Sequence, residues 1–216
     1  MTEISVANIV EYLLLATRWT LLLSPIAFVG GGLGALLLLA LRYARPKFGV
    51  RFMNIYVEIL QGTPLLIQLF LVFFGLPLLG IDVSPLVAAG VGLTLCASAY
   101  LSEIWRGCVD AIGRGQWDAS AALGMKFLTQ MRYVILPQAL KIAVPPTVGF
   151  LVQLVKSTAV TSIIGFMELM KAGNNVANAT FQPALVYGLV AAIYFCLCFP
   201  LTACARVLER KLSRAR

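Results

Sequence analysis

Three pairs of polar side chains interrupt the long apolar stretches of this sequence. They are Gln61 with Gln68, Thr94 with Ser98, and Gln153 with Lys156. Residues three, four or seven positions apart face the same side of a helix, so each pair shares one helical face. Polar groups at membrane depth are costly enough that they usually serve a purpose. If these stretches cross a membrane, the three pairs could line a polar cavity.

These polar residues have a second interpretation that involves no ligand. Glutamine, threonine and serine side chains often hydrogen-bond one membrane helix to another. A lysine near the end of a span, such as Lys156, can extend its ammonium group to the lipid headgroups. Glu103 and Arg106 lie three residues apart and are expected to pair as ions on one helix face.

The motifs of common enzymes are absent from this sequence. It has no GxxxxGK[ST] phosphate loop, no paired carboxylates at one depth and no histidine. Cys196 and Cys198 are separated by one residue, not by the two residues of a CxxC motif, which argues against a zinc site or a redox pair. We therefore expect no catalytic residue, no metal and no cofactor bound by this chain.

The composition is that of an integral membrane protein. Of the 216 residues, 60% are hydrophobic and 12% are charged, and the mean hydropathy is +0.91. The runs 19–41, 59–81 and 83–102 carry no charge, and 172–205 is longer still. At about 1.5 Å per helical residue, each run is long enough to cross a hydrocarbon layer of roughly 30 Å.

The apolar runs predict an all-α protein with five transmembrane helices. The expected helices are Trp19–Leu41, Ile55–Leu79, Pro85–Ile104, Leu136–Val155 and Pro183–Val207. Pro145 and Pro146 should interrupt the fourth helix, because proline removes a backbone hydrogen bond. Residues 157–182 contain several glycines and asparagines, and we expect an external hairpin or a partly re-entrant loop there.

The basic residues predict the orientation of the chain. Fourteen of the 17 lysines and arginines fall in residues 42–51, 106–141 and 206–216, and cytoplasmic loops carry such an excess. We therefore expect residues 1–18 to be an external N-terminal segment, 19–207 a transmembrane domain, and 208–216 a basic cytoplasmic tail. The net charge of +8 indicates contact with membrane lipid and not with nucleic acid.

Small residues at four-residue spacing mark two helices that should approach closely. Gly30 and Gly34 form a GxxxG pair, and Gly90, Thr94 and Ser98 form a small and polar stripe. Small residues at this spacing let two membrane helices pack backbone to backbone. We interpret both stripes chiefly as packing faces.

The stretch GQWDASAALGMKFLTQMRYVILPQAL, Gly115–Leu140, is the longest break in the apolar pattern. Its first 21 residues, 115–135, lie in the predicted cytoplasmic loop 106–135, and the rest begin the predicted fourth helix. Its small residues from Asp118 to Leu123 favour a short helix, and Gly124 is suited to end that helix in a left-handed conformation. Such a thin helix offers a surface that another protein can close around. The alternative is an ordinary surface helix in a long connection.

The residues of this loop resemble the signature loop (the EAA loop) of the membrane subunits of bacterial ATP-binding-cassette (ABC) importers. The signature is Glu-Ala-Ala, three residues, Gly, nine residues, and Ile-x-Leu-Pro; here it reads Asp118-Ala119-Ser120, Gly124, and Val134-Ile135-Leu136-Pro137. Four further blocks, 56–77, 99–107, 135–146 and 156–165, resemble the polar amino acid permeases of the histidine, glutamine, glutamate and arginine uptake group. Many relatives have an acidic residue after the lysine that matches Lys156, whereas this chain has Ser157.

The resemblance implies a permease subunit of an ATP-driven amino acid importer with the type I permease fold. Its N terminus would be outside the bacterial inner membrane and its C terminus in the cytoplasm. It also implies a coupling helix over residues 116–125 that docks on an ATPase, with Gln116, Asp118, Ala119, Ser120 and Gly124 as the contact residues. The implied partners are two ATP-binding subunits that use ATP and magnesium, a second copy of this chain or a paralogous permease, and a periplasmic or surface-anchored amino-acid-binding protein.

Two other classes of protein remain open at this point. One is a secondary transporter driven by an ion gradient, which is disfavoured because the sequence has no internal repeat and no acidic residue at mid-membrane depth. The other is a membrane scaffold that transports nothing. The sequence leaves open which amino acid is carried and whether the membrane pair is a homodimer or a heterodimer.

Overall fold

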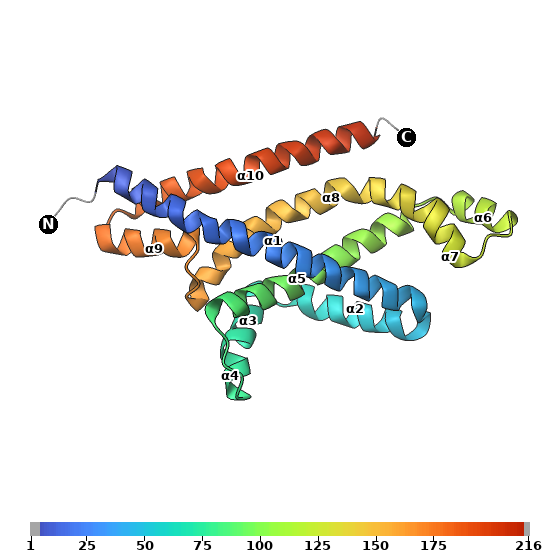
Figure 1. The fold of residues 1–216 in the computed structure, drawn as a ribbon, viewed down its shortest axis with the longest axis horizontal. Helices are drawn as coiled ribbons and strands as arrows, with labels where there is room; N and C mark the ends of the chain where they lie inside the picture. Colours follow the sequence, from blue (N-terminus) through green and yellow to red (C-terminus); the bar gives the residue numbers. More distant parts are fainter. Residues whose placement is uncertain (1–4, 214–216) are drawn as a thin grey trace.

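A computed structural model describes residues 5–213, and their regular structure is entirely helical (Figure 1). The helices are α1 (Val6–Ala44), α2 (Pro46–Gly62), α3 (Leu65–Phe70), the π-helical turn η1 (Leu71–Gly75), α4 (Leu76–Leu78), α5 (Pro85–Asp110), α6 (Arg114–Ala122), α7 (Phe127–Gln130), the π-helical turn η2 (Met131–Ile135), α8 (Leu136–Ser157), the 3-10 helix η3 (Thr158–Ile164), α9 (Leu169–Thr180) and α10 (Pro183–Ser213).

Within the described residues, four helical stretches are each long and apolar enough to cross a membrane. They are Val6–Ala44, Pro85–Asp110, Phe127–Ile164 and Pro183–Lys211. A fifth span is present if α2 and the segment 65–78 are taken together, although the two are bent by 100°. This arrangement confirms the all-α membrane architecture, with one of the five spans broken.

The predicted straight helix Ile55–Leu79 is wrong because the chain breaks at Thr63 and Pro64. Proline disfavours a helical conformation at the residue before it, and Thr63 is extended, with φ −110° and ψ 139°. Pro64 also has no N–H to donate to the carbonyl of Leu60. The side-chain amide of Gln68 donates to that carbonyl at 2.7 Å and to the carbonyl of Thr63 at 3.1 Å. Gln68 therefore satisfies the backbone groups that the bend exposes.

Helices α1 and α5 pack closely through their small residues. A Cβ atom added at Gly31 would lie 2.4 Å from the Cβ of Ala97, and one at Gly34 would lie 2.8 Å from the Cβ of Ser98. Both distances are shorter than any carbon–carbon contact allows, so the two backbones can meet only where side chains are missing. The interpretation of Gly34 and Ser98 as packing residues is confirmed.

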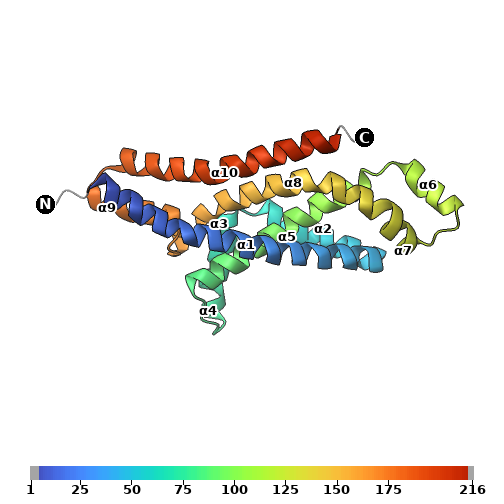
Figure 2. The same cartoon turned by 45° about the horizontal axis from the view of Figure 1, so that its top comes forward.

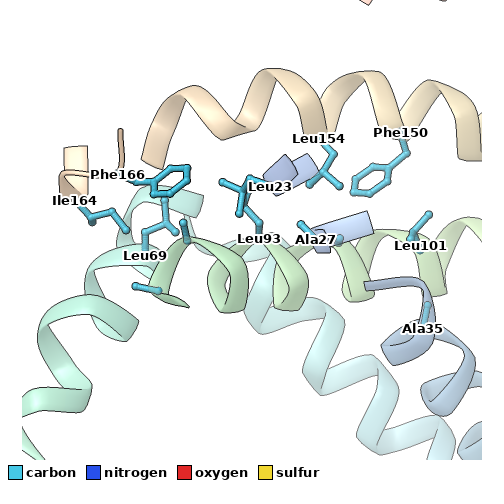
Figure 3. Packing of buried hydrophobic residues seen from close by; sticks show 13 residues of the cluster. Leu23, Ala27, Ala35, Leu69, Leu93, Leu101, Phe150, Leu154, Ile164 and Phe166 are labelled. Atoms are coloured by element: carbon cyan, nitrogen blue, oxygen red, sulfur yellow. The ribbon is translucent and has the colours of Figure 1, made fainter. Parts of the chain in front are cut away.

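The central core lies where α1, α5 and α8 meet the bent segment. Leu23 and Ala27 from α1 and Leu93 from α5 point towards Phe150 and Leu154 of α8 (Figure 3). Leu69 of α3 and Ile164 of η3 close the same cluster at the end near the bend. This core sets the position of the bent segment relative to the long helices.

Three helices extend beyond their predicted limits. Helix α1 begins at Val6 and not at Trp19, because Ile9 and Leu13 are buried against α9 and α10 although charged residues lie between them and the apolar run. Helix α10 continues to Ser213, and α5 to Asp110. Counting uncharged residues therefore locates the spans but underestimates the helices.

Helix α8 is continuous through Pro145 and Pro146, so the predicted interruption is wrong. Each proline removes one backbone hydrogen bond, but φ of proline is compatible with a helix and the remaining bonds hold the turn. The hydroxyl of Thr147 donates to the carbonyl of Ala143 at 2.6 Å in the same turn. Residues 157–182 are broken as expected, into η3 and the short helix α9.

Candidate functional site: the α6 loop and the polar cavities

Helix α6 and its ending match the sequence expectation for the loop. Gly124 has φ +72°, a left-handed conformation that glycine adopts without strain. The N–H of Gly124 donates to the carbonyl of Ala121 at 2.9 Å, and the N–H of Met125 donates to the carbonyl of Ser120 at 3.3 Å. This pair of bonds is a Schellman motif, which stops the helix and turns the chain towards α7.

Trp117 attaches α6 to the rest of the protein, and sequence reasoning did not single it out. Its ring stacks on Phe127 with centroids 6.3 Å apart, and Phe127 in turn contacts Tyr43, at 6.1 Å. Trp117 also packs on a buried cluster that includes Val109 at the end of α5 and Ala139 at the start of α8. One aromatic side chain thus connects the short helix to both long helices.

The five predicted coupling residues face in different directions. Ser120 is buried, and its hydroxyl donates to the carbonyl of Trp117 at 2.9 Å. Gln116 accepts a 3.3 Å hydrogen bond from Gln138 of α8. Asp118, Ala119 and Gly124 are exposed. Ser120 is therefore hidden from another protein, whereas Asp118, Ala119 and Gly124 are exposed, and Gln116 is exposed while it also bonds α8.

The exposed face of α6 continues over neighbouring apolar residues. Leu123 is 77% exposed and Leu128 is 78% exposed, and Tyr133 is exposed beside them. In Figures 1 and 2 this region forms one end of the molecule, opposite the end where α9 lies. Exposed leucines next to an exposed helix of small residues are typical of a surface that contacts a partner.

Lys156 borders a cavity of about 390 Å³ at the α9 end of the molecule. Tyr187 and Tyr194 of α10 and Met170 of α9 line the same cavity. Gln153, one turn earlier on α8, is exposed but does not line it. The pair predicted from the sequence is thus divided, with Lys156 alone at the cavity.

The remaining predicted path residues do not line that cavity either. Gln61 and Gln68 lie on opposite sides of the 100° bend, so they do not share a helix face as predicted. Ser98 is buried between helices and bonds the hydroxyl of Tyr56 at 2.6 Å, and Thr94 lies 3.0 Å from the position of a Cβ on Gly30. The six residues therefore lie in separate parts of the fold and do not line one cavity. Thr94, Ser98 and Gln68 hold helices together.

Glu168 is a buried carboxylate that sequence reasoning missed. It is 0% exposed and caps the start of α9 by accepting from the backbone N–H of Met170 at 2.8 Å and of Lys171 at 2.7 Å. The hydroxyl of Tyr194 donates to it at 2.9 Å. Burial raises the pKa of this carboxyl, although the three hydrogen bonds act in the opposite direction. Its position before an amphipathic stretch was the one local signal of a helix start.

The comparisons with known proteins agree with this geometry. Residues 27–214 match the model of the family described as the binding-protein-dependent transport system inner membrane component. The chain is 32% identical to the L-cystine transport system permease protein TcyB of Bacillus subtilis, over 91% of this chain and 84% of that protein. It is 38% identical to the arginine transport system permease protein ArtQ of the same organism, over 74% of each chain.

Solved structures give the same result for the fold. A crystal structure of an amino acid ABC transporter with histidines superimposes with a TM-score of 0.90, at 30% identity over 98% of this chain and 100% of that chain. The MetNI methionine ABC transporter superimposes with a TM-score of 0.76 at 22% identity, over 94% and 96% of the two chains, which supports the fold alone. The five-span fold, the α6 loop and these matches together show that the chain belongs to the family of inner membrane components of binding-protein-dependent transport systems.

Proposed function

We propose that this chain is the permease subunit of an ATP-driven amino acid importer, with its N terminus outside and its C terminus in the cytoplasm. The observation that carries the proposal is the surface of α6, which Trp117 anchors from within and which presents Asp118 and Ala119 outwards. Relatives named for cystine and arginine transport support the amino acid class. The basic segments support the orientation.

In this proposal α6 receives force from an ATPase. Two ATP-binding subunits hydrolyse ATP with magnesium, and one of them holds α6 by its exposed face. Because Trp117 contacts both Phe127 and the cluster at Val109, a displacement of α6 moves the ends of α5 and α8 together. This chain pairs with a second copy or a paralogous permease, and an external binding protein delivers the amino acid.

Lys156 is the proposed substrate contact among the predicted path residues. Its ammonium group at a cavity with two tyrosine side chains suits the carboxylate of an amino acid. Replacement of Lys156 by alanine should raise the KM for uptake while the complex still assembles. Unchanged uptake kinetics and unchanged substrate-stimulated ATP hydrolysis would show that Lys156 only anchors the helix at the lipid headgroups.

The experiment that tests the proposed function is reconstitution of the complete complex in lipid vesicles. Binding protein is loaded with each of a panel of amino acids, including arginine, glutamine and cystine, and ATP hydrolysis and uptake are measured. We expect one or a few amino acids to stimulate both. If the chain purifies without an ATPase, or if uptake continues when the nucleotide site of the ATPase is disabled, a secondary transporter or a scaffold replaces this proposal.

A further inference from the structure

Residues 42–51, which we call the α1–α2 corner, carry positive charge and no negative charge. The basic residues are Arg42, Arg45, Lys47 and Arg51, and all but Arg42 are exposed. Residues 12–57 contain no aspartate or glutamate. The corner lies at the same end of the molecule as α6 (Figures 1 and 2). Four basic residues that directly follow a membrane-spanning helix are typical of a segment that binds anionic lipid.

A row of large apolar side chains begins at the corner and runs along α2. Its members are three or four positions apart, so they share one face of the helix. They are Phe48, Phe52, Ile55 and Ile59, all of them exposed, and we call this row the α2 strip. The rings of Phe48 and Phe52 stack with their centroids 5.9 Å apart. Helix α2 therefore presents a continuous apolar surface that ends among positive charges.

The buried face of α2 keeps this strip on the outside of the chain. Met53 and Val57 are buried in a cluster with Leu38 of α1. A Cβ atom added at Gly49 would lie 2.2 Å from the carbonyl oxygen of Leu41, so the two helices meet backbone to backbone. Because α2 is fixed on α1 in this way, the strip does not rotate into the core, and something outside this chain covers it.

The charges border the strip directly. Lys47 and Arg51 are four positions apart and are neighbours on the helix surface. Arg51 lies three positions after Phe48 and four before Ile55, so its guanidinium is beside the apolar row. A phospholipid has the same arrangement, with a phosphate next to acyl chains. Basic residues attract an anionic headgroup, and an apolar helix face binds the acyl region.

Two other occupants fit this surface less well. A free phosphate ion would bind the charges but would leave the strip uncovered. A second, identical copy would cover the strip, but a two-fold contact brings the same patch of both copies together. The positive charges of the two corners would then repel each other. An anionic phospholipid alone satisfies both the charges and the apolar row.

We propose that the α1–α2 corner and the α2 strip form a binding site for an anionic phospholipid. Lys47 and Arg51 bind its phosphate, and one acyl chain lies along Phe48 and Phe52. The site goes beyond the proposed function, because it takes a lipid and does not depend on which substrate is transported.

The test uses the complete permease–ATPase complex in discs of phosphatidylcholine. The probe is a trace of phosphatidylglycerol with a photoactivatable group in one acyl chain, and phosphatidylcholine with the same group gives the background. After illumination, peptide mass spectrometry locates the crosslinks and measures their yield. We expect the phosphatidylglycerol probe to label the α2 strip well above background. Unlabelled phosphatidylglycerol should displace it, whereas inorganic phosphate should not.

Charge variants show whether the site is specific. Lys47→Gln and Arg51→Gln should each lower the crosslink yield at the strip about 5-fold, which is the contribution of one basic residue near an anionic lipid surface. The double variant Arg206→Gln/Lys211→Gln is the matched control for Lys47→Gln/Arg51→Gln. It also removes two exposed positive charges from a predicted cytoplasmic segment, but away from the strip, and should keep the wild-type yield.

Four results would overturn the inference. Equal losses in the two double variants would show that net charge alone attracts the lipid. Equal yields from the two probes would show ordinary contact with bulk lipid. Displacement by inorganic phosphate would show an anion site, and a strip without crosslinks would show that another protein chain covers it. Each of these results leaves the proposed function standing, because uptake and ATP hydrolysis are measured separately.

Discussion

Helices α6 and α9 are both short and lie at opposite ends of the molecule, but they are held in different ways (Figure 1). Helix α9 is completed by its own chain: buried Glu168 caps it, and Leu169, Ala172 and Ala177 pack on α1 and α10. Helix α6 has no side-chain cap at its start and depends on Trp117. The contrast indicates that α9 belongs to the structural core, whereas α6 has a free surface for a partner.

The largest effect on stability should come from removing the cap of α9. Glu168→Ala leaves two backbone N–H groups and the hydroxyl of Tyr194 without their acceptor, at a cost of about 3 kcal/mol. The midpoint of thermal unfolding of the purified complex should fall by roughly 6–12 °C. Trp117→Ala should lower the midpoint less, because Trp117 is only half buried. An equal or larger loss for Trp117→Ala would contradict the contrast between the two helices.

The largest effect on transport should come from Gly124→Val. At φ +72° a valine is strained by about 1–2 kcal/mol, and the ending of α6 must change its conformation or bear that strain. We expect uptake to fall about 10-fold or more while the protein still inserts into the membrane. Gly80→Val is the control, since Gly80 has φ +81° and an equally open environment away from α6. Equal losses of uptake in both variants would mean that backbone strain, and not coupling, is responsible.

Asp118→Ala should separate partner contact from folding. Asp118 is exposed and forms no ion pair among the described residues, so its loss should change the free energy of unfolding by no more than about 0.5 kcal/mol. Binding of the ATPase should weaken several-fold, because charged residues at a docking surface contribute to association. Titration of the ATPase against the membrane subunit in discs measures this effect. Wild-type affinity for the variant would remove Asp118 from the interface.

The smallest effect concerns pH and the α9 cap. Burial raises the pKa of the Glu168 carboxyl. A carboxyl with a higher pKa in the folded than in the unfolded chain stabilises the fold fully below the unfolded pKa, about 4.3, and this contribution is lost as pH rises through the folded pKa. The unfolding midpoint should therefore decline across that window by a few degrees. Glu168→Gln has no such titration, and a decline of the same size in that variant would assign it to other groups.

Local patterns were sufficient for much of the fold and for the α6 loop. The uncharged runs located the spans of α1, α5 and α10, and the small residues 118–123 with Gly124 predicted a short helix and its left-handed ending. These features depend on hydropathy and backbone preference, which act within a few residues. The GxxxG pair at Gly30 and Gly34 likewise indicated close packing before any partner helix was known.

Residues that act through distant partners could not be assigned from the sequence. The sequence predicts Gln61 and Gln68 on one face of a straight helix. The bend at Pro64 instead puts them on opposite sides of the break, and Gln68 stabilises that break by its hydrogen bond to Leu60. Glu168 lies in a stretch that looks like an exposed loop. The contacts that hold it there are remote in sequence: Tyr194 donates to its carboxylate, and the next residue, Leu169, donates to Thr20 of α1.

By itself, the sequence determined that this protein crosses the membrane, where four of its spans lie and where the α6 loop interrupts them, because hydropathy, charge and glycine conformation are properties of short segments. The tertiary structure alone decided which polar residues face a cavity, which hold helices together and which side of α6 stays free. Those roles depend on what each side chain meets across the fold, as Ser120 and Asp118 demonstrate: they are two positions apart on one helix, yet one is buried and the other exposed.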